Sequence, residues 1–240
     1  MNPLTVVHYF PILTTMLSIA FSAQIFNRYR KKSKGNHLLW WGAGVLIFGA
    51  GTFAEGFITL WGWNEVIFRF WYIVGALMGG APLAQGTVWL LLRKKTARRL
   101  TYGLVTLVSI ASICVIASPI NVVLVDPHLP SGRVFVWQWV RAFSPFINTY
   151  AVIFLVGGAI LSAWRFRKSY QKGGRGAEIA RDRFIGNVLI AVGAILPGIG
   201  GASSRAGHTE ILYIMELVGL STIWLGYWFN VRKRPVTVSS

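Results

Sequence analysis

Residues 38–62 read LLWWGAGVLIFGAGTFAEGFITLWG, an apolar stretch that carries a single ionisable side chain, Glu55. The hydrocarbon core of a bilayer requires about 20 apolar residues in an α-helix. The stretch therefore predicts a membrane-spanning helix. Trp40 and Trp41 at one end and Trp61 at the other are typical of the aromatic belts that mark the two membrane interfaces.

Six further stretches of the chain have a similar length and character. The hydrophobic fraction is 54% and the mean hydropathy is +0.55. A buried helix of a soluble core would account for one such run but not for seven. The predicted spans are 4–27, 38–62, 66–92, 100–123, 136–164, 184–204 and 209–230. The sequence thus predicts an all-α membrane protein, a single seven-transmembrane-helix bundle covering residues 1–240.

The basic residues predict the orientation of this bundle. Nearly all of the 24 Lys and Arg follow the first, third, fifth and seventh spans, so they lie in alternate loops. The exceptions, which fall toward the other side, are Arg69, Arg133, Arg141 and Arg205. Basic loops stay in the cytoplasm. We therefore expect the N-terminus outside and the C-terminus inside, in the plasma (inner) membrane of a prokaryote.

The formal net charge of +17 does not require nucleic acid as a partner. The charge lies in short loops next to the membrane, where it sets topology and attracts anionic lipid. The bilayer is therefore the expected partner, and nucleic acid is not. The single cysteine, Cys114, and histidines without ligand spacing indicate no metal site. Because no nucleophile constellation is present either, an enzyme is the least favoured class.

The longest cytoplasmic connection is expected at residues 165–183. It contains Gly173, Gly174 and Gly176 among charged side chains, which is typical of a flexible loop. No soluble module is expected before the first span or after the last. A partner, if the protein has one in the membrane, would therefore be contacted through this loop.

Small residues predict how the second and third spans pack. Gly42, Gly49 and Gly56 recur every seven residues, close to two helical turns, and so share one face of the second span. Gly75 and Gly79 form a small-xxx-small pattern on the third span. Because close backbone approach favours association in lipid, we expect these two helices to pack tightly.

Prolines fall inside three of the spans. Pro82, Pro145 and Pro197 each remove a backbone hydrogen bond and tend to kink the helix. Transporters use such interruptions around their binding sites. Kinks also occur in membrane helices of every function, so both interpretations remain open.

Four charged side chains lie where the membrane makes charge costly. Glu55 is expected about 10–12 Å below the outer end of the second span, at 1.5 Å per residue. Glu216 lies at a similar depth on the seventh span, with Arg69 and Arg141 somewhat nearer the outer surface. Pairing of an acid with an arginine would reduce the cost of burial. The set predicts a polar site open to the outside; ion pairs that only fix helix register are the alternative.

Polar and aromatic groups extend this site into the membrane. Trp71 and Tyr72 lie away from the interfaces and are candidates for lining a cavity, and Gln85 lies deeper on the same span. Core packing and hydrogen bonds between helices are the structural alternatives for them. The candidate ligand-binding residues are Glu55, Arg69, Trp71, Tyr72, Gln85, Arg141 and Glu216.

In length, number of spans and outer N-terminus, the chain resembles the plan of microbial rhodopsins. The resemblance covers topology and size and does not extend to motifs. That family attaches retinal through a lysine in the seventh span, whereas this chain has no lysine between Lys172 and Lys233. Covalent retinal is therefore excluded, and the cofactor, if any, is left unidentified. A weak echo between the first three and last three spans also resembles the three-plus-one-plus-three plan of SWEET-type and nicotinamide-riboside transporters.

Three functional hypotheses follow. The first is a seven-helix protein whose outward-facing polar pocket binds a small molecule, as a sensor or receptor, or holds a noncovalent pigment. The second is a small-solute transporter that rocks about its proline-kinked helices. The third is an accessory subunit of a larger membrane complex, which would bind protein partners rather than a small ligand.

Overall fold

The computed structural model describes residues 6–32, 35–174 and 176–232. This part of the chain is helical apart from its connections, and its β structure is confined to one isolated bridge between Ile120 and Phe135. The α-helices are α1 Phe10–Lys32, α2 Asn36–Trp61, α3 Glu65–Trp71, α4 Ala81–Leu91, α5 Lys94–Ala117, α6 Phe143–Ala151, α7 Gly157–Gln171, α8 Ala177–Arg205 and α9 Thr209–Val231. Two π-helical segments are η2 Tyr72–Leu77 and η6 Val152–Val156, and the 3₁₀ segments are η1 Val6–Tyr9, η3 Val122–Leu124, η4 Gly132–Val134 and η5 Gln138–Ala142.

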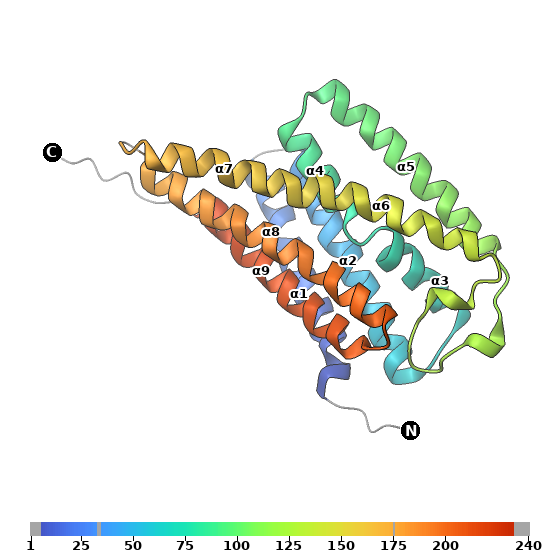
Figure 1. Cartoon of the computed structure of the whole chain (residues 1–240). Helices are drawn as coiled ribbons and strands as arrows, with labels where there is room; N and C mark the ends of the chain where they lie inside the picture. The colour runs from blue at the N-terminus through green and yellow to red at the C-terminus, as the bar shows by residue number, and fades with distance from the viewer. Residues whose placement is uncertain (1–5, 33–34, 175, 233–240) are drawn as a thin grey trace.

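Seven of these helical stretches are long and apolar enough to cross a membrane, which confirms the predicted all-helical, seven-span architecture. The third is assembled from α3, η2 and α4, and the fifth from η5, α6, η6 and α7. In Figure 1, α8 and α9 lie side by side at the front, α1 and α2 pass behind them, and α5 stands at the margin of the bundle. The seven apolar helices point to a multi-pass integral membrane protein.

One end of the bundle collects most of the positive charge, and we call it the basic end. Here α1, α4, α7 and α9 finish and α2, α5 and α8 begin, toward the upper left of Figure 1. Helix α7 continues to Gln171 and α8 already begins at Ala177, so most of the loop expected at residues 165–183 is helical. Lysine and arginine are good helix formers, and both helices therefore extend beyond their apolar parts. Gly173, Gly174 and Gly176 have positive φ and make the turn.

Helices α8 and α9 approach each other backbone to backbone. A Cβ added at Gly193 would lie 2.6 Å from the carbonyl oxygen of Gly219, and one at Gly226 would lie 2.6 Å from that of Gly186. No side chain larger than hydrogen fits at such distances. Two backbones therefore run in direct contact, the arrangement that small residues permit in membrane helices.

Helix α1, rather than the third span, covers the glycine face of α2. A Cβ at Gly49 would lie 2.5 Å from that of Ser18, and Gly42 faces the ring of Phe26. The Ser22 hydroxyl donates to the carbonyl oxygen of Gly42 at 2.9 Å. The third span instead approaches α2 through the neighbouring Gly51, which faces Gly75. The second and third spans therefore pack closely, as predicted, while the face formed by Gly42, Gly49 and Gly56 packs against α1.

The third span is broken rather than only kinked. After η2, residues 78–80 form a turn, and α4 begins with Pro82 in its first turn. Proline is tolerated there because the amide it lacks would have had no partner. The interruption leaves the carbonyl oxygen of Ala76 available, and it accepts hydrogen bonds from Ser144 Oγ at 2.8 Å and Asn148 Nδ2 at 3.2 Å. Side chains of α6 therefore replace the backbone hydrogen bond that this carbonyl oxygen would accept in a continuous helix.

Candidate functional site

The two buried acids predicted from the sequence lie next to each other. Glu55 on α2 and Glu216 on α9 are 4% and 8% exposed, and their carboxyl groups are within hydrogen-bonding reach. Glu55 Oε1 accepts a hydrogen bond from Trp71 Nε1 at 2.8 Å. The Oε2 atoms of both acids are buried without a hydrogen-bond partner. The pair lies toward the end opposite the basic end.

The two predicted arginines lie elsewhere and do not pair with these acids. Arg69 forms a salt bridge with Glu65, one helical turn away, at 2.7 Å. It also donates to the carbonyl oxygens of Val115 and Ser118 at the C-terminal end of α5, where a helix attracts positive charge. Arg141 donates to Gln138 Oε1 at 2.8 Å. Both guanidinium groups are thus satisfied near the surface, where a charge costs less than in the interior.

Tyr72 belongs to an aromatic cluster rather than to the acid pair. Its ring meets that of Phe135 edge-on, with centroids 4.8 Å apart, and it also contacts Phe68 and Trp71. This cluster is part of the core that holds the loop before α6 against the third span. Trp71, the other member of the predicted aromatic pair, donates to Glu55.

Gln85 connects three helices. It is completely buried on α4, and its Nε2 donates to the carbonyl oxygen of Ala97 at 3.2 Å and to Thr101 Oγ1 at 2.7 Å, both on α5. Its Oε1 accepts from the hydroxyl of Tyr150 on α6. Both of its donor hydrogens are therefore used by protein groups. Gln85 acts as a polar link between helices in this structure.

We expect Gln85→Leu to lower the stability of the protein by on the order of 1–2 kcal/mol, because it removes three interhelical bonds and leaves buried groups unpaired. Thermal unfolding in detergent measures the effect. The matched control is Gln24→Leu, which replaces an exposed glutamine bonded to Trp224 at 2.6 Å. Equal unfolding temperatures for the two variants would contradict the assigned role of Gln85.

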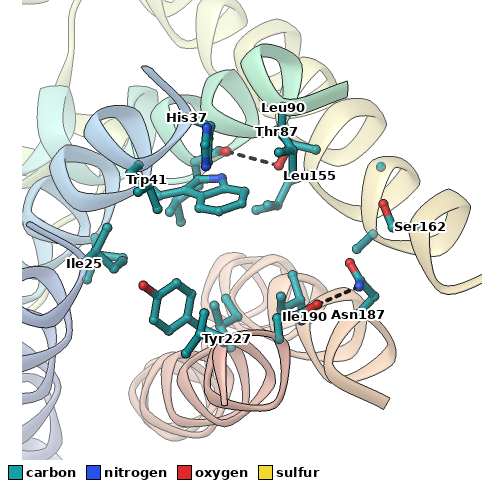
Figure 2. A pocket seen from close by; sticks show the side chains of 18 of the residues that line it. Ile25, His37, Trp41, Thr87, Leu90, Leu155, Ser162, Asn187, Ile190 and Tyr227 are labelled. Atoms are coloured by element: carbon teal, nitrogen blue, oxygen red, sulfur yellow. Dashed lines mark hydrogen bonds between the residues drawn. The ribbon is translucent and has the colours of Figure 1, made fainter. Parts of the chain in front are cut away.

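A cavity of about 300 Å³ lies at the basic end, enclosed by α1, α2, α4, α7, α8 and α9. None of the seven predicted ligand-binding residues lines it. Figure 2 shows Trp41 of α2 and Tyr227 of α9 on facing sides, with Ile25, Leu155 and Ile190 completing apolar walls. Small-molecule sites of proteins occupy roughly 300–1,000 Å³, so the cavity reaches the lower part of that range.

Polar groups lie on several walls of this cavity. Arg28 and Arg183 are both lining residues, and Arg28 lies close enough to His37 and Tyr227 to influence them electrostatically. Tyr227 is buried, and its hydroxyl lies within reach of Arg28. The described lining includes no aspartate or glutamate. The cavity therefore combines apolar walls with positive charge that no acid in its lining balances.

A second polar contact lies between α8 and α9. Asn187 Nδ2 donates to Asn230 Oδ1 at 3.1 Å and to the carbonyl oxygen of Arg183 at 2.7 Å (Figure 2). Asn230 in turn donates to the carbonyl oxygen of Gly226 at 2.9 Å. The two amides fix each other's orientation at the cavity wall.

The sequence contained an indication of this cavity, but the residues concerned were assigned roles in membrane topology instead. Arg28 and Arg183 were assigned to the basic loops and Trp41 to the interfacial belt, because each lies at the end of a span. Arg183 and Asn187 are spaced by four residues, and Tyr227 and Asn230 by three. Such spacing places each pair on one helix face. Polar pairs on the inner ends of two adjacent spans were the available indication.

The histidines are distributed among different contacts. His8 stacks edge-on against Tyr213, His37 against Trp41, and His128 Nδ1 lies 3.1 Å from the carbonyl oxygen of Thr59. Within the described ranges, no three His, Cys, Asp or Glu side chains gather as metal ligands would.

Comparison of the chain with protein-family models, with curated proteins and with solved structures finds no match. The class of the protein therefore follows from the fold itself, a multi-pass membrane protein of seven apolar helices.

Proposed function

We propose that this protein binds a small amphipathic anion, with a carboxylate or phosphate head and an apolar tail, in the cavity at its basic end. The observation that carries the proposal is that two arginines, Arg28 and Arg183, line a cavity whose described lining contains no aspartate or glutamate. Positive charge that no acid balances attracts an anion. The buried Tyr227 hydroxyl, which lies within reach of Arg28, adds a further donor to the cavity.

The charges favour an anion over a cation or a neutral ligand. Arg28 and Arg183 line the cavity, and the described lining offers no carboxylate to neutralise them. Arginine binds carboxylate and phosphate through charge-assisted, often bidentate hydrogen bonds. These bonds are stronger where the surroundings exclude water.

The walls favour an apolar tail. Ile25, Val45, Leu155 and Ile190 line the cavity on four helices, and Trp41 covers one side. Burial of apolar surface contributes about 25 cal/mol per Å². If basic loops are cytoplasmic, the ligand enters from the cytoplasm or the inner leaflet. The outward-facing pocket predicted at Glu55 and Glu216 is a different site from this cavity and stays a prediction.

The test is isothermal titration calorimetry of the purified protein with decanoate and with its neutral analogue, decanol. We expect decanoate to bind more tightly than decanol. Ser162, which lines the cavity, offers a matched pair of variants. Ser162→Phe fills the space and should weaken decanoate at least about tenfold, or 1.4 kcal/mol, whereas Ser162→Ala should retain binding. The proposal fails if Ser162→Phe binds decanoate as the wild type does.

Transport is the second candidate, and the arrangement of α2 and α9 favours it. Helix α2 carries Trp41 in the cavity and the buried acid Glu55 toward the opposite end. Helix α9 likewise carries Tyr227 in the cavity and the buried acid Glu216 toward the opposite end. The broken third span, with its turn at residues 78–80, packs against α2. Interrupted helices of this kind adjoin the substrate sites of transporters. Uptake of radiolabelled decylphosphonate by proteoliposomes, absent from empty liposomes, would distinguish a transporter from a receptor.

A further inference from the structure

The acid pair lies away from the cavity and is built from different residues. Glu55 and Glu216 are each more than nine-tenths buried, at 4% and 8% exposure, on two helices far apart in the sequence. Their carboxyl groups are within hydrogen-bonding reach of each other. One oxygen of each, Oε2, has no donor. Two independently placed side chains thus leave two unsatisfied acceptors in one buried space.

The side chains around the pair are aromatic and polar, and no described lysine or arginine forms an ion pair with either acid. Trp71 donates to Glu55 Oε1, and the Tyr213 ring lies near both acids with its hydroxyl bonded to Thr59 Oγ1 at 2.9 Å. The titratable groups that face this region from neighbouring elements are Tyr213 on α9, His8 on η1, and Asp126 and His128 in the loop after α5. Within the described side chains, neither acid forms an ion pair with lysine or arginine.

Two adjacent carboxylates in this setting repel each other and lack solvent. A charge in a membrane span costs several kcal/mol, and two like charges cost more. One proton removes the repulsion and halves the buried charge. A protonated carboxyl gains an O–H donor, and donation to the other carboxylate satisfies both oxygens that lack partners.

We propose that Glu55 and Glu216 form a proton-binding site, in which one proton is held between the two carboxyl groups and exchanges with the aqueous phase at the end opposite the basic end. The reaction is simple dissociation, in which the O–H bond breaks, the proton leaves to water and a second carboxylate remains. This site goes beyond ligand binding in the cavity, because it uses none of the cavity residues.

A short chain of polar groups connects the site with that surface. His128 is exposed, and its Nδ1 lies 3.1 Å from the carbonyl oxygen of Thr59. Thr59 Oγ1 lies 2.9 Å from the Tyr213 hydroxyl. Tyr213 lies beside both acids. The proton therefore has polar neighbours between the pair and the loop.

Infrared spectroscopy of the full chain in liposomes tests the proposal. A protonated carboxyl absorbs at a different infrared frequency from a carboxylate, so the two states can be told apart. We expect the wild type to show a carboxylic-acid band at pH 7 that shifts in heavy water. Glu55→Gln and Glu216→Gln should each shift the band, because the hydrogen-bonding partner of the remaining acid becomes an amide, and the double variant should abolish it.

The matched control is Glu65→Gln, which changes an exposed glutamate paired with Arg69 and should retain the band. Because Glu and Gln have nearly the same shape, and because either acid is tested separately, one misfolded variant leaves the other as a test. Absence of the band from the wild type, an unshifted band in both single variants, or its persistence in the double variant would overturn the proposal. Loss of the band when sodium replaces potassium at constant pH would also overturn it, because the site would then bind a metal cation.

Discussion

Replacing Gly193 by alanine is expected to destabilise the protein by about 1–3 kcal/mol, the usual cost of overpacking a close contact. The added Cβ would lie 2.6 Å from the carbonyl oxygen of Gly219 and 2.9 Å from the backbone nitrogen of Ile223. Neither atom can move without shifting α9. Combining this change with Gly226→Ala, whose Cβ would meet the carbonyl oxygen of Gly186 at 2.6 Å, should prevent recovery of folded protein.

Gly198→Ala and Gly201→Ala are matched controls on the same helix. A Cβ at either position has no neighbour within 4 Å. Alanine is a better helix former than glycine by about 1 kcal/mol, so these controls should be neutral or stabilising. Thermal unfolding in detergent separates the two groups of variants. If Gly193→Ala unfolds at the same temperature as Gly198→Ala, direct backbone contact between α8 and α9 is not what holds this helix pair together.

Neutralising both cavity arginines, with Arg28→Gln and Arg183→Gln together, is expected to weaken decanoate binding by about 100-fold or more. A hydrogen bond to a charged group contributes about 1.5–3 kcal/mol, and each 1.4 kcal/mol corresponds to a factor of ten. Decanol, which carries no charge, should lose little affinity in the same variant. Calorimetry with both ligands measures the difference.

The control for net charge is the double variant Arg98→Gln and Arg99→Gln at the start of α5. Both side chains belong to the basic end, and neither lines the cavity. This variant should bind decanoate as the wild type does. Equal loss of affinity in the two double variants would show that decanoate responds to the general field of the basic end and not to the cavity.

Hydropathy along the chain was sufficient to predict the helices, because each span is apolar over its whole length. The break at residues 78–80 was not predicted, although Pro82 was recognised. Proline alone indicates a kink. The full interruption also depends on Ser144 and Asn148, which bond to the carbonyl oxygen of Ala76 from another helix.

The packing of glycine faces was predictable only in part. Gly42, Gly49 and Gly56 do form a contact face, since the helical period determines which residues share a side. Which neighbour covers that face depends on how each helix is rotated. The backbone contact of Gly193 with Gly219 joins two spans for which no packing was predicted.

The depth of Glu55 and Glu216 along their helices indicated the acid site. Which side chains contact them depends on the rotation of each helix about its axis. Glu55 and Glu216 were expected near arginines because all four residues lie toward the same membrane surface. Arg69 instead reaches Glu65, which is only one helical turn away, and the two acids meet each other. An ion pair between residues one turn apart on the same helix forms more readily than a pair between helices, because it does not depend on how the helices pack.

By itself, the sequence determined the seven spans, their alternating basic loops and the identity of the two buried acids, because these depend on composition and on distance along each helix. Only the tertiary structure decided that the acids adjoin each other and that Arg28, Arg183 and Tyr227 share one cavity. The physical reason is that contacts between helices depend on rotation about each axis and on close packing of small residues. Neither is specified by the hydropathy of a single span.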